Sequence, residues 1–187
     1  MTLYDEISQY TPYNEQEKHD KAQMLDFIER NNDYLLRSNT VAHFSTSLWT
    51  VNRERTKVLM IYHNIYKSWA WVGGHADGIE DLRAVALREL EEETGIKNAR
   101  FADDEILSLE TLTVNGHIKR GQYVPSHLHM NISYLVEADE ADSIRIKEDE
   151  NSGVRWFTFD EALKAASEKW IVENVYKKIV DKLGRMP

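Results

Sequence analysis

The order of the predicted secondary-structure elements indicates an α/β fold, an α/β/α sandwich with a mixed β-sheet. Three observations support this prediction: a polar helical segment before residue 40, two groups of strand-like segments on either side of one strong helix, and two helical segments at the end. With 187 residues, the chain suits one domain with a substantial core. We expect a single domain over residues 1–187, made of a helical N-terminal extension (1–40), a core (41–166) and a C-terminal helix (167–187).

The N-terminal segment, residues 11–39, has the pattern of a polar helix. Thr11 followed by Pro12 is typical of a helix start, and Asn14 with Glu17 three residues later is a second candidate N-cap. The apolar residues of this segment form an interrupted stripe at helical spacing, which suits packing against a sheet. We expect the segment to pack against the core and to carry no chemistry.

Strands are predicted where β-branched and aromatic residues gather between turn residues. The first two, residues 43–51 and 57–63, are joined by a turn, and a third strand over residues 69–72 stops at Gly73 and Gly74. Further strands are expected at 106–114, 127–136 and 154–159, and the closing helices at 160–166 and 169–183.

The strongest helical pattern covers residues 80–94. Its apolar positions follow helical spacing at Leu82, Val85, Ala86 and Leu90. Gly95 follows, and glycine is the residue that most often ends a helix in the left-handed conformation. We therefore predict that this helix ends at Gly95.

Composition limits the functions that the chain can have. The formal net charge of −9 argues against a partner that is a nucleic-acid polymer or an anionic membrane, because neutralising phosphates requires clustered Lys and Arg. There is no cysteine, so disulfides, thiolate metal sites and cysteine nucleophiles are excluded. The first ten residues lack the pattern of a signal peptide, and we expect a cytoplasmic location. An acidic protein can still bind phosphates through bound cations.

The helix at residues 80–94 carries three acidic side chains on one face. Glu89 and Glu93 are four residues apart, and Glu92 is three residues from Glu89. Like charges at this spacing repel each other and weaken a helix unless cations neutralise them. Carboxylate oxygens suit Mg²⁺ or Mn²⁺, whereas zinc would favour Cys or His ligands. The competing interpretation is a solvated acidic helix face.

Neighbouring residues favour the metal site. Arg88 can pair with these carboxylates and orient them, and Gly73 and Gly74 allow close backbone approach where the strand meets the loop. The segment closely resembles a complete Nudix box: a Gly, five residues, a Glu, seven residues, then Arg-Glu-aliphatic-x-Glu-Glu-x-Gly-aliphatic. Every fixed position matches, at Gly74, Glu80, Arg88, Glu89, Leu90, Glu92, Glu93, Gly95 and Ile96.

The resemblance extends over about residues 41–166 and implies a Nudix-type fold with bound Mg²⁺ or Mn²⁺. It implies that the cations are held by the Gly73 carbonyl and by Glu89, Glu92 and Glu93. Arg88 and Glu80 would support these ligands. The candidates for the general base are Glu93, Glu148 and Glu150, and a solvated loop explains the last two equally well. The predicted catalytic residues are therefore Arg88, Glu92, Glu93 and Glu150.

Three histidines are candidate substrate-binding residues. His127 and His129 alternate in a predicted strand, so their side chains share a face. The substrate cleft is slightly preferred over a half-exposed pair, because the strands after the box form one wall of the cleft in Nudix folds. His75 follows Gly74 directly, and a plain loop histidine is the equal alternative. Lys119 and Arg120 could meet a substrate phosphate or form a solvated turn.

The resemblance implies a hydrolase that cleaves a phosphoanhydride bond in a nucleoside diphosphate linked to another moiety, or in a related small diphosphate. One alternative is a non-catalytic nucleotide-binding or regulatory module, but such proteins typically lose a box glutamate. Another is an enzyme similar to isopentenyl-diphosphate isomerase, which the absence of cysteine disfavours. The expected partner is a small-molecule diphosphate, with no membrane and no nucleic-acid polymer, and a homodimer is possible.

Overall fold

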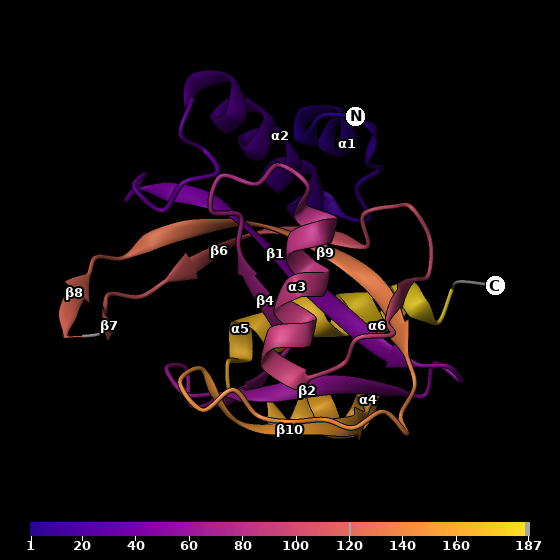
Figure 1. Cartoon of the computed structure of the whole chain (residues 1–187). Helices are drawn as coiled ribbons and strands as arrows, with labels where there is room; N and C mark the ends of the chain where they lie inside the picture. The colour runs from indigo at the N-terminus through magenta and orange to yellow at the C-terminus, as the bar shows by residue number, and fades with distance from the viewer. Residues whose placement is uncertain (120, 186–187) are drawn as a thin grey trace. The chain divides into compact units, whose positions relative to one another are not determined.

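The structure is a computed structural model that describes residues 1–119 and 121–185 (Figure 1). The chain divides into two compact units. Unit 1 consists of Met1–Ser47, Gly74–Val85 and Glu105–Ser133, and unit 2 consists of Leu48–Gly73, Ala86–Asp104 and Tyr134–Pro187. Four elements have residues in both units: β1 (Ala42–Asn52), β4 (Val72–His75), α3 (Leu82–Thr94) and β9 (His127–Ala138).

Within the described ranges, eight strands form one sheet. Its main path is β10 (Asn151–Thr158), β2 (Lys57–His63), β1, β9 and β5 (Arg100–Phe101). Three strands pair beside this path: β3 (Ser68–Ala70) on β2, β4 on β1, and β6 (Ser108–Val114) on β9. A separate two-stranded ribbon is formed by β7 (His117–Lys119) and β8 (Gln122–Val124).

Unit 1 begins with two helices, α1 (Leu3–Gln9) and α2 (Glu15–Arg30), of which α2 packs against β6. Asn14 is the N-cap of α2, because its side-chain oxygen accepts from the backbone N–H of Glu17 at 2.9 Å. The prediction of a helix start at Thr11 is therefore wrong, and the helical pattern predicted to about residue 39 ends at Arg30. Thr2 caps the shorter helix α1, which the sequence pattern did not predict.

A buried polar network in unit 1 ties α2, β1, β6 and β9 together. The carboxylate of Glu17 accepts from the hydroxyl of Ser108 at 3.0 Å. Asn131 of β9 accepts from Ser45 at 3.2 Å and from Ser47 at 2.9 Å, both in β1. Because buried polar groups are costly unless they are paired, these bonds fix how β1 lies against β9.

Unit 2 is built on β2 and the strands beside it. The helix α4 (Phe159–Ala165) packs against β10, β2 and β3. The C-terminal helical segment consists of α5 (Lys169–Ile171), a π-helical turn η1 (Val172–Tyr176) and α6 (Lys177–Leu183). In the core, the Tyr176 ring lies 5.3 Å from both the Trp49 and the Trp71 rings. The predicted strands at 43–51, 57–63, 127–136 and 154–159 and the closing helices are thus present, with shifted ends.

Two corrections concern the segment around the paired glycines. The strand predicted to stop at Gly73 and Gly74 is two strands, β3 and β4, and β4 continues through both glycines to His75. The following helix begins at Leu82, two residues later than predicted, where Asp81 accepts from the backbone N–H of Ala84 at 3.0 Å. No helix among the described residues is both long and apolar enough to span a bilayer.

The predicted end of α3 at Gly95 is confirmed. Gly95 adopts φ of 82°, the left-handed conformation that favours glycine, and its N–H donates to the Glu91 carbonyl at 2.9 Å. A Cβ atom at this position would also lie only 2.9 Å from Cγ of Arg145. The helix therefore ends where its acidic face meets the segment that leads into β10.

Candidate active site

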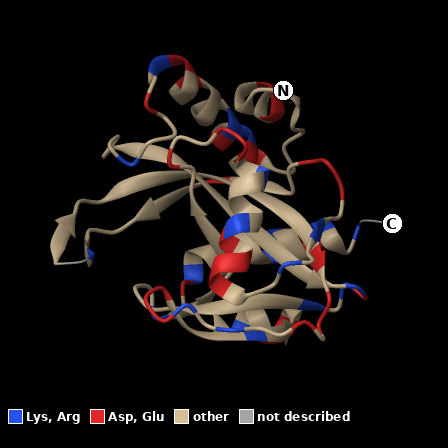
Figure 2. Ribbon diagram, in the orientation of Figure 1, with Lys and Arg blue, Asp and Glu red and all other residues tan. Residues whose placement is uncertain are grey.

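The last turns of α3 contain acidic residues, which are coloured red on the ribbon in Figure 2; they include Glu89, Glu92 and Glu93. Glu93 is buried and Glu89 is half-buried, while Glu92 is exposed. The degree of burial differs among the three residues because each residue along a helix is rotated by about 100° from the one before it. The three carboxylates therefore meet water to very different extents, although they lie within five consecutive residues of one helix.

Arg88 pairs with two carboxylates of this helix, as the sequence predicted. Its Nη2 atom donates to Oε1 of Glu89 at 3.1 Å, and its Nε lies 3.9 Å from Oε1 of Glu92. Burial raises the pKa of Glu89, and the hydrogen bond from Arg88 acts in the opposite direction. Arg88 thus stabilises the charged form of a half-buried carboxylate and fixes the direction in which it points.

Glu93 has the most perturbed carboxyl group of the cluster. Only 3% of the residue is exposed, and its Oε2 atom has no hydrogen-bond partner within the part of the chain that the structure describes. Burial, together with the negative charges of Glu150 and Glu89, raises the pKa of Glu93 to about 9. A carboxyl in this environment is protonated at neutral pH unless a cation stabilises its charged form.

Lys147 connects the helix to the loop before β10. Its Nζ lies 3.0 Å from Oε2 of Glu92 and 3.0 Å from Oε2 of Glu150. Burial lowers the pKa of Lys147, but its hydrogen bonds to the two carboxylates outweigh this effect and leave the pKa raised. Glu150 is thereby held next to the box, where its negative charge raises the pKa of Glu93.

Asn151 fixes the start of β10 against the end of α3. It is fully buried, and its Nδ2 donates to the backbone carbonyl of Glu93 at 3.0 Å. Its Oδ1 accepts from the backbone N–H of Lys147 at 3.3 Å. The sequence interpretation missed both Lys147 and Asn151, because nothing local indicates that a loop more than fifty residues away returns to the helix.

The remaining predicted residues of the box have other surroundings. Oε1 of Glu80 accepts from the backbone N–H of Leu3 at 3.1 Å, so this carboxylate contacts helix α1 in unit 1. Gly73 is half-buried in β4. Glu148 is exposed, in contrast to Glu150. The predicted support by Glu80 and the predicted metal contact of the Gly73 carbonyl therefore stay predictions.

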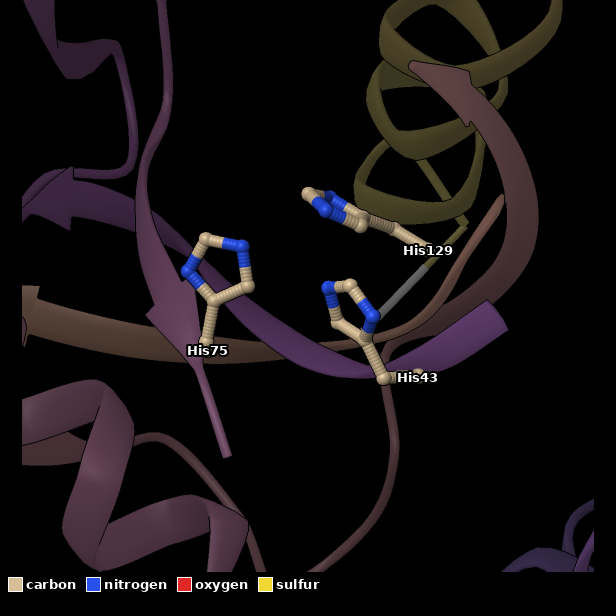
Figure 3. A group of neighbouring side chains, drawn as sticks. All are labelled: His43, His75 and His129. Atoms are coloured by element: carbon tan, nitrogen blue, oxygen red, sulfur yellow. The ribbon is translucent and has the colours of Figure 1, made fainter. Parts of the chain in front are cut away.

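The predicted histidines gather in unit 1 together with a fourth one, His43. Figure 3 shows His43, His75 and His129 from β1, β4 and β9 with their rings turned toward one another. One ligand nitrogen from each ring lies within 4.8 Å of the others. The Nε2 atom of His127 lies 3.1 Å from Nε2 of His129. His43 was missed because a single histidine in a strand of Ser, Thr and aromatic residues gives no signal of its own.

Three of these rings are neutral at physiological pH. Burial lowers the pKa of His75 to about 3 and that of His129 to about 2, and it also lowers the pKa of His43. Neutral imidazoles have a free lone pair and can act as metal ligands or hydrogen-bond acceptors. Lys119, whose charge contributes to these shifts, is exposed in β7, and Arg120 lies outside the described residues. The predicted binding of substrate by His75, His127 and His129 stays a prediction.

The NUDIX domain family model matches residues 42–179. No curated protein sequence matches the chain. An Ap4A hydrolase from C. elegans has 20% identity and a TM-score of 0.55, with 76% of this chain and 98% of that one covered. An E. coli dihydroneopterin triphosphate pyrophosphohydrolase has 14% identity and a TM-score of 0.54, with coverage of 74% and 95%.

A MutT protein from Methanosarcina mazei Go1 is also similar in structure. It has 14% identity and a TM-score of 0.57, and 79% of this chain and 99% of that one are covered. At these identities the similarities show the fold. The predicted Nudix-type α/β sandwich with a mixed sheet is thereby confirmed.

Proposed function

The chain belongs to the NUDIX domain family and is a Nudix hydrolase, and we propose that it uses bound divalent cations to cleave a phosphoanhydride bond. The proposed substrate is a nucleoside diphosphate linked to another moiety, or a related small diphosphate. The observation that carries this proposal is the burial of the Glu93 carboxyl beside Glu89 and Glu150. Three carboxyls in one partly buried place repel one another unless cations are bound.

The side chains in this cluster fit a hard divalent cation. They supply oxygen atoms only, which Mg²⁺ and Mn²⁺ prefer. The Oε2 atom of Glu93 is a buried acceptor without a partner among the described residues, and a cation would satisfy it. We propose Glu89, Glu92, Glu93 and the Gly73 carbonyl as the ligands. When bound, the cations would polarise the phosphoryl oxygens, lower the pKa of the attacking water and neutralise the leaving group.

The other residues of the cluster would position these ligands and move a proton. Arg88 would hold Glu89 and Glu92 in place through the contacts already described. Lys147 would hold Glu150 next to Glu93. We propose Glu150 as the general base, since its carboxylate is held at the cluster, whereas Glu148 is exposed. His75, His127 and His129 are proposed to bind the substrate.

The class of substrate is supported by two similar structures. One is described as an Ap4A hydrolase and the other as a dihydroneopterin triphosphate pyrophosphohydrolase. Both names describe cleavage within a chain of phosphates that is attached to a heterocyclic compound. In this proposal, the residues of the box determine which bond is cleaved. Residues outside the box determine which group attached to the phosphates the enzyme accepts.

The proposal is tested by incubating the chelator-treated protein with Mg²⁺ or Mn²⁺ and a panel of nucleotide sugars, ADP-ribose, dinucleoside polyphosphates and nucleoside triphosphates. Products are separated by anion-exchange chromatography, and ¹⁸O-water shows which phosphorus atom is attacked. We expect cation-dependent release of a nucleoside phosphate from at least one compound. Tight binding of one compound without any hydrolysis would instead assign the chain to the non-catalytic binding modules.

A further inference from the structure

The three histidines shown in Figure 3 form a second candidate metal site, made of nitrogen ligands and lying wholly in unit 1. His43, His75 and His129 come from three different strands, and one nitrogen of each lies within 4.8 Å of the other two. We propose that these three histidines bind one transition-metal ion of the Zn²⁺ type. This ligand set shares no residue with the carboxylates of the proposed hydrolase, but His75 and His129 are also proposed above to bind the substrate, so the test measures metal binding and not turnover.

The hydrogen bonding of His43 leaves one ring nitrogen available to bind a metal ion. It is 3% exposed, and its Nδ1 lies 3.0 Å from the backbone carbonyl of Asn39, to which it donates. That hydrogen bond places the proton on Nδ1 and leaves a lone pair on Nε2. Nε2 is buried and has no hydrogen-bond partner among the described residues. A buried acceptor without a partner is costly, and a bound ion would remove this cost.

His127 acts on His129 as a positioning residue. Its Nδ1 donates to the backbone carbonyl of Pro125 at 2.8 Å, so in the neutral ring its Nε2 is an acceptor. This Nε2 faces Nε2 of His129 at 3.1 Å. The contact sets the orientation of the His129 ring, as second partners of metal-binding histidines commonly do.

The strands that carry the ligands are held in register by side chains next to them. Asn131 follows His129 by two residues on the same face of β9, and Ser45 follows His43 by two residues on the same face of β1. Ser45 donates to Asn131 at 3.2 Å. His43 and His129 are thus brought together by a buried hydrogen bond that lies one step further along both strands.

The ligand chemistry selects the class of metal. Imidazole nitrogens suit Zn²⁺, Cu²⁺, Ni²⁺ and Co²⁺, whereas Mg²⁺ prefers oxygen. A tetrahedral ion with bonds of about 2.0–2.1 Å holds its ligand nitrogens about 3.4 Å apart, so small side-chain rotations close the set. Three protein ligands leave one position open for water or an oxyanion. Arg37 lies near the cluster, but Asp77 neutralises it through hydrogen bonds of 2.6 and 2.7 Å.

The test measures metal binding by chelator-treated full-length protein in excess Mg²⁺, which occupies carboxylate sites. Zn²⁺ is titrated in competition with a chromophoric chelator, and Co²⁺ is titrated with visible spectroscopy to report nitrogen ligation. We expect one Zn²⁺ per chain with a dissociation constant at or below about 1 µM. We expect His43→Gln and His75→Gln to weaken binding by at least ~100-fold. His19→Gln, which changes an exposed histidine of α2, is the matched control.

Two further variants separate this site from the acidic cluster and from a general loss of structure. Glu93→Gln is expected to retain Zn²⁺ binding, and loss of Zn²⁺ in that variant would move the ion to the carboxylates and overturn the proposal. His75 is only half-buried, so His75→Gln tests the site even where the buried His43→Gln variant unfolds. Unchanged Zn²⁺ affinity in a folded His75→Gln protein would also overturn it.

The role of His127 has its own readout. His127→Phe keeps a ring but removes both nitrogens, and we expect Zn²⁺ binding to weaken by about 10–100-fold with a changed Co²⁺ spectrum. His127→Gln retains an acceptor and should restore part of the affinity. Wild-type affinity and spectrum in His127→Phe would contradict the positioning role.

Discussion

The ammonium group of Lys147 lies 3.0 Å from Oε2 of Glu92, so a loop residue neutralises part of the acidic helix face. A cation bound by Glu92 would compete with this lysine. We expect Lys147→Met to lower the half-saturating Mg²⁺ concentration by roughly two- to fivefold. This factor corresponds to the small free energy of a partly exposed ion pair. We also expect kcat to fall, because Glu150 loses the same partner. Titrating activity against Mg²⁺ separates the two effects, and a higher Mg²⁺ requirement would contradict the competition.

The buried carboxylate of Glu93 supports a second prediction. We expect Glu93→Gln and Glu92→Gln each to lower kcat by at least about 100-fold, because each change removes a proposed cation ligand worth several kcal/mol. The matched control is Glu91→Gln. Glu91 lies on the same helix but is exposed and paired with Lys97 at 3.4 Å. Steady-state kinetics at saturating Mg²⁺ decide the matter, and equal turnover in all three variants would remove these residues from the site.

The helix of the box was predictable because its information is local. The spacing of Glu89, Glu92 and Glu93 fixes their face, and Gly95 ends the helix, so a few consecutive residues suffice. The partners of the helix were not predictable in this way. Lys147 and Asn151 reach it only because the chain returns from a distant loop into β10, and no local periodicity encodes that return.

The same limit explains the errors at β4 and at the histidines. Glycine usually weakens a strand, so the paired glycines predict an end of the strand at this point. Pairing with β1 nevertheless carries the strand through Gly73 and Gly74 to His75. The cluster of His43, His75 and His129 then depends on pairing between strands, whereas the alternation of His127 and His129 was visible within one strand.

Variants in the loop before β10 test which carboxylate is the general base. We expect Glu150→Gln to lower kcat by about 10²–10⁴-fold, which is the usual contribution of a general base. Glu148→Gln should have a much smaller effect, because Glu148 is exposed. Asp149→Asn, also exposed, is the control for charge in this loop. A larger loss in Glu148→Gln than in Glu150→Gln would reverse the assignment.

Asn151 provides a prediction for stability. Asn151→Ala removes the donor to the Glu93 carbonyl and leaves buried backbone groups unpaired. We expect the free energy of unfolding to fall by about 1–3 kcal/mol. We also expect kcat to fall, because the loop that carries Glu150 is no longer fixed against α3. Urea unfolding measures the first effect. Ser152→Ala, at the exposed neighbouring position, is the control and should be stable.

The histidine cluster predicts how the stability of the chelator-treated protein depends on pH. Burial, together with the neighbouring cationic and histidine groups, lowers the pKa of His75 to about 3 and that of His129 to about 2. Below the unfolded pKa of about 6.5, the unfolded chain therefore binds protons that the folded chain does not. The contribution of these groups to the free energy of unfolding is fully present above that pH. It is lost as the pH falls toward 3, by up to about 1.4 kcal/mol per pH unit for each group.

Thermal unfolding between pH 7.5 and 5 measures this effect. We expect a smaller decrease in Tm on acidification for His75→Gln than for wild type, and an unchanged decrease for the exposed-site control His19→Gln. The raised pKa of Glu93 has the opposite effect on the pH dependence of stability, because it favours the folded state as the pH falls from about 9. Because Glu93 is the same in all three proteins, the difference between variants isolates the histidine. Parallel acid profiles in wild type and His75→Gln would show that His75 is not buried in its neutral form.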